Sequence, residues 1–314
     1  MKKSFLFGLV AALGLVACGQ SPSKQKQSQN RTSAPLENSL LWKISGNGLS
    51  KPSYLFGTMH IVCDSRIGLS DSLRNAISKA DEIFLEIDMS DQLGMMSALM
   101  NMKMQGDTTL ADLLSAQDYK KVKEHFEKSG GMIPFNMLEN FKPMLISSML
   151  MEQGGGCENM VIMDQLVMEE AQKHDIKIDG LETVKFQISM FDSIPYKFQA
   201  EQLVKMIDNK GDTADRSQMD KLTNAYRNQE LSKMDELIMQ DDISMNHFTD
   251  LLLYNRNKNW ARKLQELLPN KSLVVAVGAG HLPGEKGVIN LLRKAGYKVE
   301  PVKNDMVKKT GKDI

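Results

Sequence analysis

A unit of strand, turn, helix and strand occurs twice in this sequence, and each copy carries Gly-x-x-His where its first strand ends. In the N-terminal copy, residues 53–57 form the predicted strand, His60 ends the motif, and residues 70–79 have the periodicity of an amphipathic helix. The second strand, residues 82–89, is an almost continuous apolar run of the kind buried in parallel sheets, yet Glu86 lies at its centre. This pattern favours an α/β fold.

The C-terminal copy repeats the same order. Residues 272–277 form a predicted strand, His281 ends Gly-Ala-Gly-His, and a helix over 287–294 precedes a strand over 297–301. We expect the two copies to be matching halves of one central mixed or parallel sheet. Residues from about 90 to 265 are mainly helical by periodicity, so we predict one domain with a large helical insertion.

The two histidines are predicted to meet at one edge of this sheet. In open α/β sheets, functional groups gather beyond the carboxyl ends of the strands. Imidazole is the commonest protein ligand for divalent transition metals, and a carboxylate in so apolar a strand is costly unless it is paired or metal-bound. His60, Glu86 and His281 are therefore predicted to bind a divalent metal and leave room for a water molecule. For either motif alone, a hydrogen-bonded structural histidine is the alternative.

Two further charged residues are candidates for the same site. A helix predicted over residues 248–268 has an apolar stripe that Arg256 interrupts, and such an arginine needs an anionic partner. It either pairs with Glu86 or Glu182 or stabilises negative charge on a substrate oxygen, and the pattern leaves both roles open. Glu182, in Gly-Leu-Glu-Thr, is a candidate general base or partner of a ligand histidine, with a helix cap or salt bridge as the structural alternative.

The N-terminus has the pattern of a secretory signal. Lys2 and Lys3 precede an apolar run over residues 5–16 that is too short for an ordinary transmembrane helix. The sequence Leu-Val-Ala-Cys-Gly around Cys18 resembles the lipobox of bacterial lipoproteins, in which the cysteine receives lipid such as palmitate. Residues 1–17 are predicted to be cleaved and the protein to be lipid-anchored in the cell envelope, on the extracytoplasmic side of a bacterial membrane. A lone N-terminal transmembrane anchor is the alternative.

Composition sets the limits of the folded part and excludes one class of partner. Residues 18–35 are rich in Ser, Gln and Lys and suit a flexible tether. The domain is predicted over residues 36–302, and the Lys-rich residues 303–314 as a frayed basic tail. Without Lys2 and Lys3, 37 basic residues face 39 acidic ones, so no overall positive field holds nucleic acid and no such partner is expected.

Two cysteines remain once Cys18 carries lipid. In an oxidising exported compartment, Cys63 and Cys157 are a possible disulfide. Two unpaired buried thiols are the alternative, because sequence alone does not place their Cα atoms within bonding range.

Four segments occur in the order and separation of a known family. They are LFGTMH, FLEID, GLET at residues 180–183, and VGAGHLPGEKGVINLLRKAGYKV. Together they resemble the TraB/GumN family, which includes the TIKI proteins, over residues from about 40 to 302. The resemblance implies a fold shared with erythromycin esterases and haem-binding ChaN-like proteins. It also implies metal-dependent proteolysis, because animal members use Mn²⁺ or Co²⁺ to cleave secreted signalling proteins.

The resemblance assigns roles by position. His60, Glu86 and His281 match the family's metal-binding and catalytic set, and Arg256 followed by Asn257 also resembles a family pattern. The prediction is a metal-dependent hydrolase, plausibly a peptidase acting on a peptide or protein, with Mn, Co or Zn as the metal. The alternatives are a non-enzymatic lipoprotein that binds haem, metal or peptide, and an interaction protein that uses the helical insertion as its surface. The sequence predicts no oligomeric state.

Overall fold

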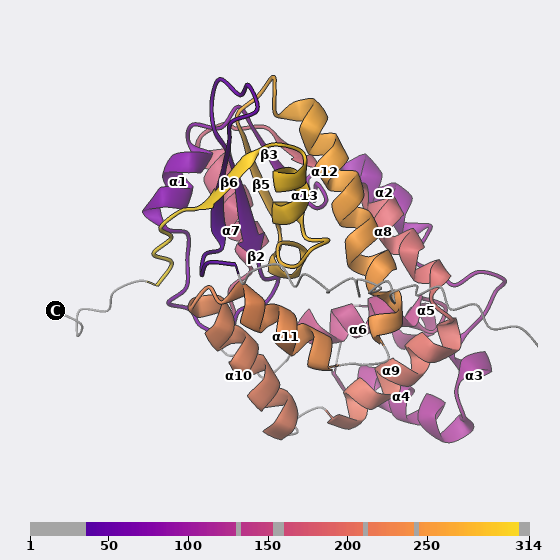
Figure 1. Ribbon diagram of the computed structural model, residues 1–314. Coiled ribbons are helices and arrows are strands. Elements are labelled where there is room, and N and C mark those ends of the chain that lie inside the picture. Colours follow the sequence, from indigo (N-terminus) through magenta and orange to yellow (C-terminus); the bar gives the residue numbers. More distant parts are fainter. Residues whose placement is uncertain (1–35, 130–132, 153–159, 210–212, 242–244, 308–314) are drawn as a thin grey trace, which may run out of the picture. The chain divides into compact units, whose positions relative to one another are not determined.

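A six-stranded mixed sheet forms the centre of the domain, with strands in the order β4-β3-β5-β2-β1-β6 (Figure 1). The computed structural model describes residues 36–129, 133–152, 160–209, 213–241 and 245–307. The predicted signal peptide, Cys18, the whole tether, Cys157 and residues 308–314 lie outside the described residues. The strands are β1 (Leu41–Ser45), β2 (Ser53–Thr58), β3 (Glu82–Leu85), β4 (Ile178–Gly180), β5 (Leu273–Gly278) and β6 (Lys298–Pro301).

The four strands β4, β3, β5 and β2 are parallel, whereas β1 is antiparallel to both β2 and β6. In this register Thr58 pairs with Gly278, and Leu85 pairs with Gly180. The carboxyl ends of the four parallel strands therefore meet at one edge of the sheet. The predicted α/β fold, with two strand–helix–strand units in one sheet, is confirmed.

Local sequence explains why these segments form a buried sheet. β5 reads Leu-Val-Val-Ala-Val-Gly, and its first five residues are buried, as expected for β-branched residues covered on both faces. Helix α7 lies behind the sheet in Figure 1, while α12 and α13 lie in front of it and pack against each other. Helix α1 begins where the Ser70 hydroxyl accepts a hydrogen bond from the Leu73 amide, an N-cap typical of serine.

The inserted segment is mainly helical, as predicted, and builds a second small core. Helices α3, α4, α5, α6 and α9 contribute to this core, which includes Val122, Phe126, Ile146 and Leu203. The helices are α1 (Asp71–Ile77), α2 (Gln92–Leu99), α3 (Leu110–Leu113), α4 (Ala116–Ser129), α5 (Phe135–Leu138), α6 (Pro143–Glu152), α7 (Met163–Lys173), α8 (Val184–Met190), α9 (Tyr196–Asn209), α10 (Thr213–Arg227), α11 (Leu231–Asp241), α12 (Asn255–Leu267) and α13 (Val288–Lys294). Among the described residues, no helix is both long enough and apolar enough to cross a membrane.

Three details differ from the sequence prediction. β3 ends at Leu85, so Glu86 follows the strand and is not at its centre. The expected helix over 248–268 contains a π-helical turn, Asp250–Tyr254, directly before α12. The frayed tail is wrong for residues 303–307, because Asn304 and Met306 are buried and the Met306 carbonyl accepts a hydrogen bond from the Gly68 amide.

The loop after β2 is fixed to the start of α7. Val62 and Val161 exchange two backbone hydrogen bonds of 2.9 Å each. Cys63, beside this bridge, is disulfide-bonded. Val161 is four positions from Cys157 in the sequence, and Val62 directly precedes Cys63. The pairing of these two cysteines stays a prediction.

Candidate functional site

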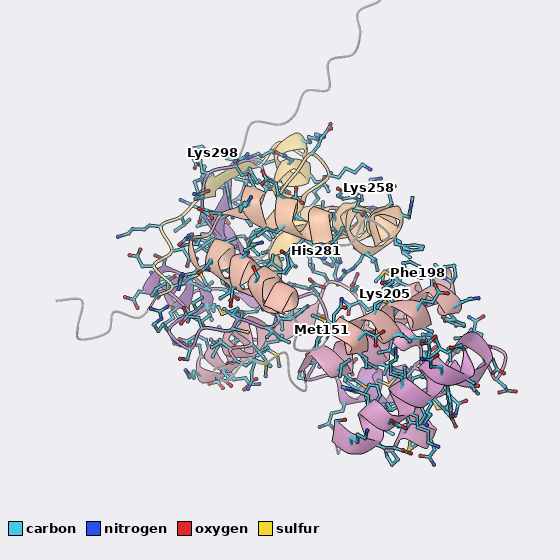
Figure 2. The ribbon with its side chains drawn as sticks, turned by 90° about the horizontal axis from the view of Figure 1, so that it is seen from below. Met151, Phe198, Lys205, Lys258, His281 and Lys298 are labelled. Atoms are coloured by element: carbon cyan, nitrogen blue, oxygen red, sulfur yellow. The ribbon has the colours of Figure 1, made fainter. Side chains whose placement is uncertain are left out.

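Each of the four parallel strands delivers one polar residue to the same edge of the sheet. His60 follows β2, Glu86 follows β3, Glu182 follows β4 and His281 follows β5. The Glu182 amide donates to the Glu86 carbonyl at 2.9 Å, so the backbone pairing of β3 and β4 continues to these two residues. His281 lies near the middle of the domain when the molecule is seen from below (Figure 2).

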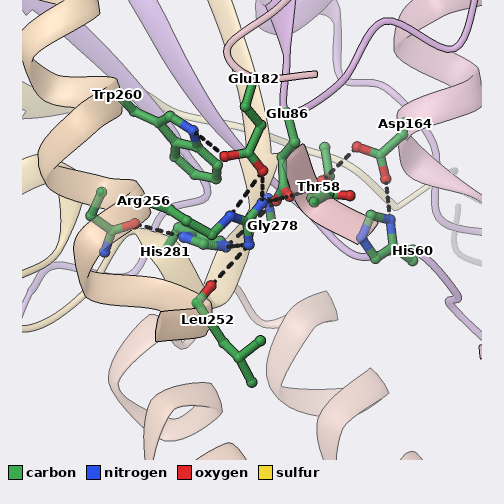
Figure 3. A network of polar contacts seen from close by, with 12 residues as sticks. Thr58, His60, Glu86, Asp164, Glu182, Leu252, Arg256, Trp260, Gly278 and His281 are labelled. Carbon is green, nitrogen blue, oxygen red and sulfur yellow. Dashed lines mark hydrogen bonds and ion pairs between the residues drawn. The ribbon is translucent and has the colours of Figure 1, made fainter. Parts of the chain in front are cut away.

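Arg256, on α12, joins the side chains at this edge (Figure 3). Its Nη2 donates to Glu86 Oε2 at 2.5 Å and to Glu182 Oε1 at 2.6 Å, and its Nε also donates to Glu182 Oε1, at 2.9 Å. Its Nη1 donates to the Leu252 carbonyl at 2.9 Å and to His281 Nε2 at 3.1 Å. A guanidinium has five N–H donors, and these contacts use all five.

Both glutamates of this cluster are buried, and Glu86 is ionised. The side chains of Glu86 and Glu182 are 9% and 7% exposed, and Arg256 is 8% exposed. Burial alone raises the pKa of Glu86, but His281, Arg256 and the Gly278 amide outweigh it and lower the pKa to about 2. Gly278 N donates to Glu86 Oε1 at 2.8 Å. Two carboxylates therefore share one guanidinium in a site with little solvent.

His281 is held as a neutral imidazole. Because Arg256 can only donate, Nε2 of His281 must accept, and the ring proton is on Nδ1. That Nδ1–H donates to Asn257 Oδ1 at 2.6 Å. Burial lowers the pKa of His281 to about 4 although Glu86 opposes this effect. The ring also packs on Trp260, with centroids 4.4 Å apart, and Trp260 Nε1 donates to Glu182 Oε2 at 3.1 Å.

His60 has a different environment, with a carboxylate partner and an exposed ring. Its Nδ1 bonds Asp164 Oδ2 at 2.9 Å, while the Thr58 hydroxyl donates to Asp164 Oδ1 at 2.8 Å. The side chain of His60 is 74% exposed, and that of Asp164 is 19% exposed. The hydrogen bond to Asp164 raises the pKa of His60 to about 9, so the imidazolium is favoured at neutral pH.

Glycine is required where these residues come closest. A Cβ on Gly278 would lie 3.1 Å from Glu86 Oε1, so a larger residue would push that carboxylate away from the Gly278 amide. A Cβ on Gly180 would lie 2.6 Å from the Glu182 carbonyl oxygen, closer than real Cβ contacts allow. Both glycines end parallel strands, so they allow the glutamates to sit directly against the strand ends.

The side chains at this edge are of types that bind divalent metals, and both histidines are oriented by hydrogen bonds as metal ligands usually are. Both histidines are held through Nδ1, by Asp164 and by Asn257, as ligand histidines usually are when Nε2 binds the metal. His281 Nε2 and Glu86 Oε1 are 3.7 Å apart. Two atoms that each bind one cation at about 2.1 Å lie roughly 3–4 Å from each other, so this pair can share a metal. In the part of the chain that the structure describes, no three His, Cys, Asp or Glu side chains converge closely enough to hold one.

The structure thus brings together most of the residues predicted for the site. Glu86, His281, Arg256 and Glu182 form one connected network, and both ion pairs considered for Arg256 are present. His60 lies at the same sheet edge but bonds a partner outside that network. Whether any of these residues binds metal or acts in catalysis stays a prediction.

Sequence reasoning missed the residues that orient the two histidines and Glu86. Asp164 lies in the first turn of α7, and Gln187, which donates to Glu86 Oε2 at 3.0 Å, lies on α8. Acidic and amide residues at such positions are common on any exposed helix, so neither has a local signal. Asn257 directly follows Arg256 in the sequence, but nothing in the sequence indicates that its side chain contacts His281.

Comparison with known proteins agrees with this arrangement. A family model described as the TraB/PrgY/gumN family matches residues 40–301, which is most of the chain. The chain belongs to the TraB/PrgY/gumN family. The match covers both Gly-x-x-His motifs and every residue of the network, so the resemblance predicted from four segments is confirmed.

The relatives of this TraB/PrgY/gumN protein include animal proteases. It is 25% identical to Metalloprotease TIKI2 of Danio rerio over 84% of this chain and 61% of that protein. Identity is 27% to Metalloprotease TIKI2 of Xenopus tropicalis, over 84% and 60%, and 25% to Metalloprotease TIKI1 of Homo sapiens, over 84% and 62%. The chain thus spans about three fifths of the length of these relatives. No solved structure matches the chain.

Proposed function

We propose that this protein is an exported, lipid-anchored, metal-dependent hydrolase that cleaves peptide bonds. The observation that carries the proposal is the meeting of Glu86, His281 and Arg256 at one sheet edge, with His281 Nε2 and Glu86 Oε1 at 3.7 Å. The similarity to TIKI metalloproteases supports the reaction class, and the substrate class is taken from their name.

His281 and Glu86 would supply the first two ligands of the metal, through Nε2 and Oε1. His60 would supply the third through Nε2, and it must lose a proton to do so because the Asp164 contact favours its imidazolium. When bound, a divalent metal lowers the pKa of a water molecule and polarises the carbonyl of the scissile bond. Mn²⁺, Co²⁺ and Zn²⁺ are all compatible with two imidazoles and a carboxylate.

The chain's own residues account for orientation and charge. Asn257 and Asp164 fix the rings of His281 and His60 through Nδ1, which directs each Nε2 away from its partner. Arg256 is buried against Glu86, and its guanidinium could donate to a carbonyl oxygen that becomes negative once it gives up one of its five present contacts. Burial of the network keeps these charged contacts strong.

The N-terminal pattern supports the export and anchoring parts of the proposal. The apolar run over residues 5–16 and the lipobox-like sequence ending at Cys18 match a lipoprotein signal, and residues 18–35 suit a tether. The partner proposed for this end of the chain is a bacterial membrane, with the domain on its extracytoplasmic side.

Hydrolysis is tested by incubating the protein with Mn²⁺, Co²⁺ or Zn²⁺ and then with a mixture of synthetic peptides. Mass spectrometry detects the cleavage products. We expect cleavage by the wild type, its loss on chelation and its return on adding metal. Glu86→Gln and His281→Ala should each lower kcat/KM by roughly 10²-fold or more while the proteins stay folded. Glu285→Gln changes an exposed glutamate, 73% exposed, and is the matched control.

Two results would count against the proposal, the first against its site and the second against hydrolysis. Full cleavage by both site variants would place the activity elsewhere in the chain. Stoichiometric metal binding, or a haem absorption band, without cleavage of any peptide would favour a binding protein instead.

A further inference from the structure

The guanidinium of Arg256 holds the same two side chains that a metal would need. It donates to Glu86 through Nη2 and to His281 Nε2 through Nη1, at 2.5 and 3.1 Å. The Nε2 atom has a single lone pair, and that lone pair cannot accept from Arg256 and bind a metal at the same time. The metal and the guanidinium therefore exclude each other at His281.

The charges of the cluster favour a second cation. Glu86 and Glu182 are both buried, and Arg256 is the one arginine or lysine among the described residues that forms an ion pair with either of them. Two negative charges against one positive charge leave a net negative site, which is expensive in a region of low polarity unless another cation is near. Nearby Lys263 donates to the carbonyls of Gly180 and Leu181, not to either carboxylate.

Arg256 also has contacts that do not involve Glu86 or His281. Its Nε and Nη2 both contact Glu182 Oε1, at 2.9 and 2.6 Å, and its Cζ lies 4.6 Å from the centre of the Trp260 ring. A guanidinium that retains Glu182 and Trp260 while it turns away from Glu86 and His281 would stay paired and buried. Glu182 thus gives the arginine a partner in either arrangement.

We propose that Arg256 is an internal competitor for the metal: in the metal-free protein it pairs with Glu86 and occupies the Nε2 lone pair of His281, and a divalent cation binds as the guanidinium retreats onto Glu182. This inference rests on the proposed function and adds a residue that lowers metal affinity.

The test is equilibrium binding of Mn²⁺ and Co²⁺ to the purified full-length protein in detergent, measured by calorimetry at one fixed pH. Arg256→Gln removes the charge, and we expect it to bind Mn²⁺ roughly tenfold or more tightly than the wild type does. Arg256→Lys keeps the charge but cannot match five donors, so its affinity should fall between the two. Arg262→Gln removes an exposed arginine from the same helix, where it contacts Asn259, and should leave affinity unchanged.

The results separate this inference from the proposed hydrolase. Tighter binding by Arg256→Gln supports it even if no variant cleaves a peptide. Equal or weaker binding by Arg256→Gln, with the wild type active, overturns it and leaves the hydrolase in place. No binding by any variant overturns both. If Arg256→Gln does not fold, Arg256→Lys decides: higher affinity than the wild type supports the inference, and equal or lower affinity refutes it.

Discussion

Glu86→Gln should change how the stability of the protein depends on pH. The wild-type carboxylate has a pKa lowered from 4.5 to about 2 in the folded protein. A lowered carboxylate pKa contributes stability that is complete above the unfolded pKa and is lost as the pH falls through the folded one. The relevant window is therefore pH 5 to 2.

The magnitude follows from the size of the shift. Lowering the pKa of Glu86 from 4.5 to about 2 corresponds to about 3 kcal/mol of unfolding free energy at pH 6. At pH 3 the folded carboxylate is still mostly ionised while the unfolded one is mostly protonated, and about 1 kcal/mol remains. The wild type should thus lose about 2 kcal/mol more than Glu86→Gln between these pH values.

The assay is urea unfolding of both proteins at pH 6, 4 and 3, with far-UV circular dichroism as the signal. Glu285→Gln, at an exposed and weakly paired position, should follow the wild type at every pH. A constant free-energy gap between the wild type and Glu86→Gln from pH 6 to pH 3 would refute the argument that Arg256 and its neighbours hold Glu86 ionised.

Three other predictions concern the first motif and the N-terminus. Asp164→Asn should bring the pKa of His60 down from about 9 toward 6.5, which an NMR titration of the ring protons measures; an unchanged pKa would mean that Asp164 is not its cause. Peptide mapping of the unreduced protein should recover Cys63 joined to Cys157, and reduction should cost about 2–4 kcal/mol of stability; a free Cys157 thiol would contradict the pairing. Cys18→Ala should abolish incorporation of labelled palmitate and release the protein from the membrane fraction, whereas unchanged labelling would remove Cys18 as the lipid site.

The sequence predicted the sheet and the meeting of its two motifs because both depend on local signals. Apolar runs ending in Gly-x-x-His mark β2 and β5, and parallel pairing then places His60 and His281 at one edge. The antiparallel β1 was not predicted.

What the sequence could not predict depends on contacts between distant segments. Asp164 is 104 positions from His60, and Asn257 is 24 positions from His281. Whether Arg256 pairs with Glu86, Glu182 or both also depends on how α12 packs over the sheet, and the structure has both pairs. The end of β3 was misjudged because apolar residues continue past Leu85, where the ladder stops.

The place of β5 has a consequence for how this chain folds. β5 lies between β2 and β3 in the sheet, yet Gly278 at its end contacts Glu86 across 192 positions of sequence. Until β5 is present, no strand joins β2 to β3 in the sheet, and the Gly278 amide is missing from the Glu86 carboxylate. Pairing over such a separation makes formation of the sheet slow, since a very long loop must close first. A fragment of residues 36–272 should contain the helical core but no complete sheet edge, so the site is complete only after β5 has joined the sheet.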